Sequence, residues 1–89
     1  MVLYFMSLTI RQTCISNLHV RMQYLTAQLN EIAELIDCFE QHPKRVNAIR
    51  ERLSICSKCC MLMKDTLLFL SGEGDQPLHL NPTLNPLLY

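Results

Sequence analysis

The stretch ISNLHVRMQYLTAQLNEIAELIDCF, residues 15–39, decides the fold. Its large apolar residues recur at alternating steps of three and four positions: Ile15, Leu18, Met22, Leu25, Leu29, Ile32, Ile36 and Phe39. This spacing is a heptad repeat in which every a and d position is apolar, and it is typical of an α-helix that keeps one side against another helix. At a rise of 1.5 Å per residue, such a stripe extends for about 36 Å.

A second heptad repeat follows a proline break. Pro43 interrupts the first helix, because the residue before a proline avoids the helical region, and Pro43 can itself open the next helix. Continuing the first repeat would place Pro43, Arg50 and Ser57 at core positions, so the second repeat has its own phase. We therefore predict an all-α fold, an antiparallel helical hairpin of the coiled-coil type with helices over about residues 7–41 and 44–71. The second repeat consists of Val46, Ile49, Leu53, Cys56, Cys60, Met63, Leu67 and Leu70.

The chain divides into a helical module, residues 1–71, and an irregular tail, residues 72–89. Gly72 is a natural left-handed end for the second helix. The tail contains two Asn-Pro steps, which favour turns and extended backbone. Its leucines leave two interpretations open, a mobile terminus and a segment that packs back on the hairpin.

Charge and composition bound the function and the location. The net charge is zero, so no overall field attracts nucleic acid. The apolar start, residues 1–6, is too short to span a bilayer and lacks the basic region of a signal peptide. Five cysteines are an odd number, which does not suit a secreted disulfide scaffold. We expect a cytoplasmic protein with no transmembrane segment and no nucleic-acid partner.

The opposite charges around the break favour a folded-back hairpin. The end of the first repeat is acidic and the second repeat is basic; the residues concerned are Glu31, Glu34, Asp37 and Glu40, then Lys44, Arg45, Arg50, Arg52, Lys58 and Lys64. Exposed pairs of this kind contribute only about 0–1 kcal/mol each, so they bias the geometry without driving it.

The cysteine cluster is the candidate for chemistry. Cys56 and Cys59 form a C-x-x-C motif next to Cys60, and Cys38 with His42 could supply a second pair of zinc ligands. A hairpin that turns near residue 43 places the two pairs about two helical turns out of level. We therefore predict no metal and no cofactor, with Cys56 and Cys59 as the remaining metal candidates. A metal- or redox-responsive regulator that uses Cys56, Cys59 and Cys60 stays as an alternative function.

No catalytic constellation is present in the sequence. There is no glycine-rich phosphate loop, no paired-carboxylate pocket and no nucleophile motif. We predict that the protein is not an enzyme and has no catalytic residues.

The apolar stripes predict an interaction protein. A further apolar row on the second helix recurs every seven residues and has no partner within one hairpin, which marks an interface. We predict a non-enzymatic structural subunit of a hetero-oligomeric coiled-coil or helical-bundle complex, and keep a homo-oligomeric scaffold as an alternative. The predicted partner-binding residues are Ile15, Leu18, Met22, Leu25, Leu29, Ile32, Ile36, Ile55, Leu62 and Phe69.

The order of these features resembles the snapin family of small coiled-coil subunits. The resemblance rests on LTAQLNEIAELI (residues 25–36), VNAIRERL (residues 46–53) and the apolar run to Leu70. It implies a cytosolic, non-enzymatic subunit of the assemblies that build and position lysosomes and related organelles. It also implies a place at the surface of an organelle, in vesicle or organelle trafficking.

Overall fold

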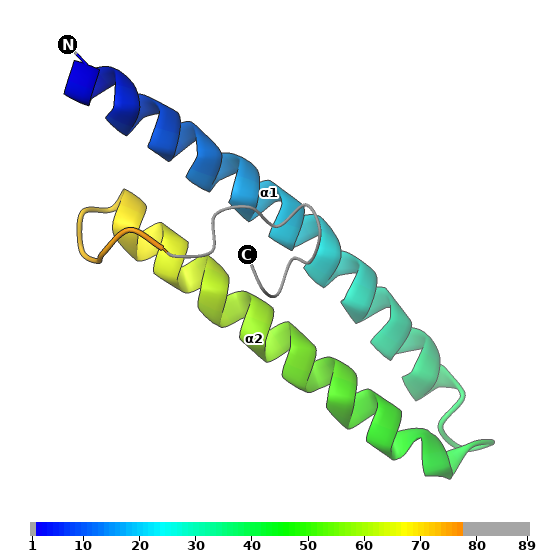
Figure 1. Ribbon diagram of the computed structural model, residues 1–89. Coiled ribbons are helices and arrows are strands. Elements are labelled where there is room, and N and C mark those ends of the chain that lie inside the picture. The colour runs from blue at the N-terminus through cyan, green and yellow to red at the C-terminus, as the bar shows by residue number, and fades with distance from the viewer. Residues whose placement is uncertain (1, 78–89) are drawn as a thin grey trace.

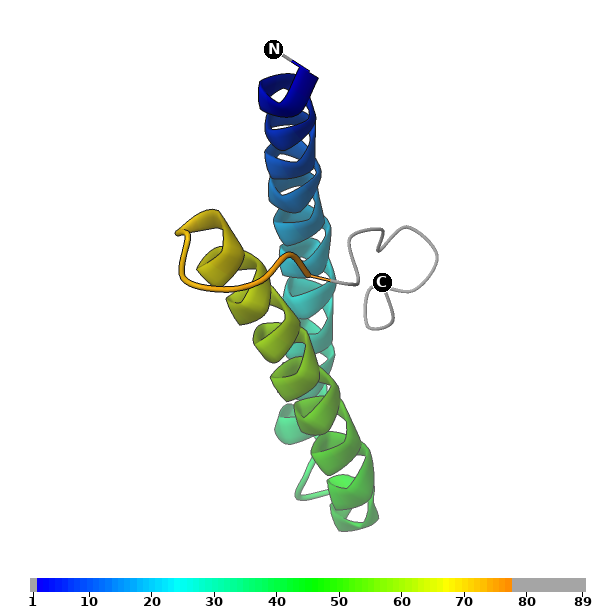
Figure 2. The same ribbon diagram turned by 60° about the vertical axis from the view of Figure 1, so that its left-hand side comes forward.

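Two long helices make up most of the described part of the chain (Figure 1). The computed structural model describes the backbone of residues 2–77 and the side chains of residues 8–77. Helix α1 spans Val2–Asp37, the short 3-10 helix η1 spans Pro43–Arg45, and helix α2 spans Val46–Leu70. The two long helices run antiparallel, and Figure 2 shows that they cross at an angle. The predicted all-α helical hairpin is confirmed.

The first helix is displaced toward the N-terminus relative to its prediction. It begins at Val2 instead of residue 7 and ends at Asp37 instead of residue 41. No proline or glycine interrupts the apolar lead, so the helix continues almost to the terminus. At the other end Phe39 lies in a turn, closed where the His42 N–H donates to the carbonyl oxygens of Cys38 at 3.0 Å and Phe39 at 3.1 Å. The repeat predicted Phe39 as the last position of the helical stripe. This prediction is wrong, because Phe39 lies beyond the end of α1.

Pro43 and Gly72 lie at the two ends of the second helix, as predicted. Pro43 is the first residue of η1, which leads directly into α2. At the C-terminus Gly72 adopts a positive φ of 77° and its N–H donates to the Phe69 carbonyl oxygen at 3.0 Å. The Glu73 N–H donates to the Leu68 carbonyl oxygen at 2.8 Å. These two bonds form a Schellman motif, which satisfies the last carbonyl groups of the helix.

The most deeply buried side chains of the hairpin are mainly short or polar. The buried residues are Cys14, Asn17, Arg21, Ile32, Cys56, Cys59 and Thr66. Only Ile32 belongs to the heptad stripe of the first helix, and only Cys56 to that of the second. Alternate residues of each stripe are exposed, whereas the residues between them, such as Leu25 and Met63, are buried or half-buried, so only part of each stripe joins α1 to α2.

Cross-helix contacts fix the register of the hairpin. The Cys59 thiol lies 3.5 Å from the Arg21 carbonyl oxygen, near the middle of both helices. Closer to the turn, Arg52 Nη1 donates to Gln28 Oε1 at 3.2 Å and forms an ion pair with Glu31. This ion pair confirms the expected attraction between the acidic end of α1 and the basic start of α2.

Candidate protein-interaction surface

A row of exposed apolar side chains runs along α1. Each is between 42% and 57% exposed, and the row recurs every seven residues: Leu8, Ile15, Met22, Leu29 and Ile36. Residues seven apart stay within about 20° of one another around an α-helix, so the row is nearly straight. It covers almost the full length of the described helix.

A matching row runs along α2. Leu53 and Leu67 are 50% and 52% exposed, and Cys60 lies exposed halfway between them. Each residue of this row follows directly on a buried or half-buried one: Leu53 after Arg52, Cys60 after Cys59 and Leu67 after Thr66.

The row on α1 has the same relation to the interior. Ile15 follows the buried Cys14, Met22 follows the buried Arg21, and Leu29 follows the half-buried Gln28. One residue is a turn of about 100° around a right-handed helix. Because α1 and α2 are antiparallel, this turn carries the side chain to the same side of the hairpin on both helices. The eight residues of the two rows therefore form one surface, the apolar face: Leu8, Ile15, Met22, Leu29, Ile36, Leu53, Cys60 and Leu67.

The register aligns the two rows of the apolar face. Arg21 is level with Cys59, so Met22 and Cys60, one residue further along each helix, lie within about 3 Å of the same level along the axis. The contact between Gln28 and Arg52 places Leu29 and Leu53 in the same way. The hairpin thus presents apolar residues from both helices at each level.

The interior beneath this face contains charge. Arg21 is 1% exposed, and its Nε donates to Oδ1 of the equally buried Asn17 at 2.8 Å. Burial lowers the pKa of the Arg21 guanidinium. Burying such groups costs free energy unless they are hydrogen-bonded, so the interior contributes less to stability than an apolar one of the same size. The hairpin thus buries polar groups, whereas the large aliphatic side chains of the apolar face stay about half exposed.

The predicted partner-binding residues fall into separate groups. Ile15, Met22, Leu29 and Ile36 lie on the apolar face. Ile32 is 5% exposed and belongs to the interior, so it is not available to a partner of the folded hairpin. The other predicted residues are half-buried: Leu18, Leu25, Ile55, Leu62 and Phe69.

The row predicted on the second helix lies on the other side of the hairpin. Leu62 is two residues beyond Cys60, a turn of about 200°, which places it away from the apolar face. Leu53, Cys60 and Leu67 belong to the predicted repeat of the second helix, but the sequence did not show that they share one surface with Leu8 and the row on α1. Their signal is the seven-residue recurrence directly after a buried position.

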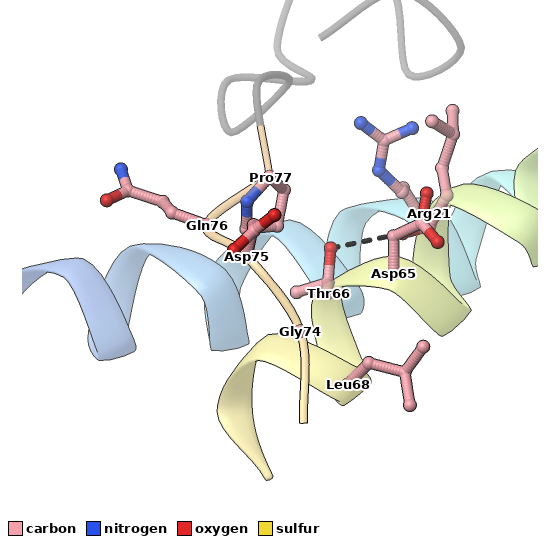
Figure 3. A pocket seen from close by; sticks show the side chains of 9 residues that line it. Arg21, Asp65, Thr66, Leu68, Gly74, Asp75, Gln76 and Pro77 are labelled. Carbon is pink, nitrogen blue, oxygen red and sulfur yellow. Dashed lines mark hydrogen bonds between the residues drawn. The ribbon is translucent and has the colours of Figure 1, made fainter. Parts of the chain in front are cut away.

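An open pocket of about 430 Å³ lies on the side of Leu62 (Figure 3). The segment 74–77 lies on one side of this pocket and Arg21 on the other, with Thr66 between them. Gly74 packs closely here, since a Cβ atom at this position would lie 3.2 Å from the Leu68 Cβ. Residues 74–77 therefore pass over the side opposite the apolar face. The rest of the predicted irregular tail, residues 78–89, lies outside the described residues.

The cysteines of the C-x-x-C motif are interior residues. Cys59 is fully buried and Cys56 is 7% exposed, and burial raises the pKa of both thiols. Cys60 and Cys38 are exposed. Within residues 2–77, no three His, Cys, Asp or Glu side chains are grouped so that they could hold a metal ion.

In comparisons with protein-family models, curated proteins and solved structures, nothing matches this chain. The resemblance to the snapin family stays a prediction. Neither helix of the described residues combines the length and the apolar character needed to cross a membrane.

Proposed function

We propose that this protein is a non-enzymatic structural subunit that joins other helical proteins through its apolar face. The observation that carries the proposal is the inverted distribution of side chains. Arg21 and Asn17 are buried between the helices, whereas Met22 and Leu29 are about half exposed. A chain that stays monomeric would be more stable with the apolar side chains buried and the polar ones exposed.

Burial of the apolar face would contribute a large favourable free energy to assembly. Covering the exposed half of one large aliphatic side chain contributes about 1 kcal/mol. The apolar face offers seven large aliphatic side chains in addition to Cys60. Contiguous exposed apolar surface of this extent marks protein–protein interfaces in soluble proteins.

The partner class follows from the shape of the surface. Its residues stand on two helices and repeat every seven positions, which is the spacing that another helix with a heptad repeat would match. A hetero-oligomeric coiled-coil or helical-bundle complex is thus the leading assembly. The resemblance to snapin-like subunits adds organelle and vesicle trafficking as the proposed setting.

Light scattering after size exclusion, with far-UV circular dichroism on the same fractions, tests the proposal. We expect the purified chain alone to give heterogeneous or aggregating material. A variant with Ile15→Glu, Met22→Glu and Leu29→Glu should be a well-behaved helical monomer, because it removes the surface that lacks a partner. A wild-type chain that is already a monodisperse monomer would contradict the proposal, and a discrete dimer or tetramer would favour the homo-oligomeric scaffold.

A further inference from the structure

Within the two helices, the charged residues beside the apolar face all have one sign. Side chains three or four positions apart are neighbours on a helix surface. Three charged residues of α1 and α2 lie three or four positions from a member of the apolar face: Arg11, Arg50 and Lys64. No acidic residue of either helix occupies such a position. The border of the face is therefore basic along both helices, although the net charge of the chain is zero. Glu40, four residues after Ile36, lies in the turn beyond the end of α1.

These basic side chains are available to a partner. All three are exposed. Arg11 donates through Nη1 to the Leu70 carbonyl oxygen at 3.2 Å, which leaves its charge uncompensated. The ion pair found in residues 8–77 joins Arg52 to Glu31 and involves none of the three.

The charge of the border discriminates between occupants. A second copy of this chain, packed face to face, would bring one basic border against another, and like charges across an interface are unfavourable. The segment 74–77 lines the pocket on the opposite side of the hairpin, and residues 78–89 carry no Asp or Glu that could pair with the basic border. A helix with acidic flanks would satisfy both the apolar rows and the basic border.

We propose that the apolar face binds an amphipathic helix of another protein, whose apolar heptad stripe is flanked by Asp and Glu residues. This inference rests on the proposed function and specifies the partner. The helix lies along the hairpin over the levels of Ile15, Met22 and Leu29, where both rows contribute side chains. Arg50 and Lys64 border the row on α2 and Arg11 borders the row on α1. The basic side chains select the partner by charge, and the apolar rows provide the buried surface.

Two synthetic peptides test the charge selection with the full chain. Each has about four heptads with Leu and Ile at a and d. One carries Glu at the flanking e and g positions and the other carries Lys. Repulsion between like charges keeps each peptide from pairing with itself. Fluorescence anisotropy at low ionic strength should show at least about tenfold tighter binding of the Glu peptide, and added salt should reduce the difference.

Charge reversal provides the matched control. Arg50→Glu combined with Lys64→Glu should abolish or invert the preference, with the far-UV circular dichroism spectrum unchanged. Lys58→Glu also reverses the charge of an exposed side chain, but no residue of the apolar face lies three or four positions from Lys58. This variant should keep the preference for the Glu peptide.

The outcomes separate this inference from the proposed function. Equal binding of both peptides, lost in Leu29→Asp, would overturn the acidic partner and keep the apolar face as the interface. A tight dimer of the chain that excludes both peptides through this face would overturn the acidic partner in favour of a second copy. No binding of either peptide, together with a monodisperse monomeric chain, would overturn the proposed function itself.

Discussion

The Cys59 thiol lies against the backbone carbonyl oxygen of Arg21, 3.5 Å away, and this contact is buried at the centre of the hairpin. It brings the two helices together through a small side chain and a backbone group instead of through large apolar side chains. The next residue on each helix, Met22 and Cys60, turns to one common side and is exposed. The contact therefore determines both the register of the hairpin and the surface left for a partner.

Leu29→Asp separates assembly from folding. Leu29 is 48% exposed in the hairpin, so the aspartate remains hydrated and the free energy of unfolding of the monomer should change by about 0.5 kcal/mol or less. In the assembly the same charge would be buried without a partner, which costs several kcal/mol. We expect unchanged helicity and no association, measured by circular dichroism and analytical ultracentrifugation. Asn30→Asp, an exposed neighbour off the apolar face, should associate as wild type; association that survives in Leu29→Asp would remove this residue from the interface.

A second pair of variants compares the interior with the apolar face. Ile32 is 5% exposed and Ile36 is 57% exposed, although both belong to the same heptad stripe. Ile32→Ala should lower the free energy of unfolding by about 2–4 kcal/mol through lost burial and a cavity. Ile36→Ala should lower it by under about 1 kcal/mol in a monomeric background, such as the triple glutamate variant. Urea unfolding followed by circular dichroism measures both, and equal costs would show that the hairpin buries the whole stripe.

The cysteines should react at rates set by burial. Cys38 and Cys60 are exposed, whereas Cys14 and Cys59 are fully buried and burial raises the pKa of their thiols. A folded chain treated with a thiol reagent should be modified first at Cys38 and Cys60, and at least about tenfold more slowly at the buried pair. Peptide mapping by mass spectrometry gives the order. Fast modification of Cys59 would be incompatible with its place between the helices.

The same buried thiols predict a pH dependence of stability. Their pKa is raised in the folded chain, so the native state holds more protons than the unfolded state once the pH passes about 8.5, the pKa of an unfolded thiol. The stability that the buried, protonated thiols contribute is fully present below that pH. The free energy of unfolding falls as the pH rises above it. Denaturant unfolding at pH 7 and pH 10 under reducing conditions measures the loss. The variant with Cys14→Ala, Cys56→Ala and Cys59→Ala should lose less stability over the same interval; an equal loss would assign the effect to other groups.

The sequence was sufficient to predict the two helices, the break between them and the end of the second helix. Heptad spacing indicates a helix whatever covers it, and the effects of Pro43 and Gly72 on the backbone are local. For these reasons the hairpin, its break and its C-terminal cap agree with the prediction. The bounds of α1 differ because its apolar lead has no stop signal and its last turn unwinds into the connection.

The packing surfaces could not be predicted in the same way. A heptad stripe shows which residues are stabilised by burial. It does not show whether the second helix of the same chain or another protein covers them. Beside Ile32 and Cys56, which belong to the stripes, the interior contains Cys14, Arg21 and Thr66, which no apolar pattern marks. The choice between Cys59 and the adjacent Cys60 for the interior depends on a rotation of one residue, which the sequence leaves open.

Site-specific photo-crosslinking in living cells tests the central claim, that the apolar face is the surface of assembly. A photoreactive amino acid is introduced at Met22 or Leu53, and at the exposed neighbours Gln23 or Ser54 as controls. We predict a discrete adduct with the same helical partner protein from Met22 and Leu53 and none from the controls. Adducts of equal yield from the control positions, or no adduct from the apolar face, would contradict the account.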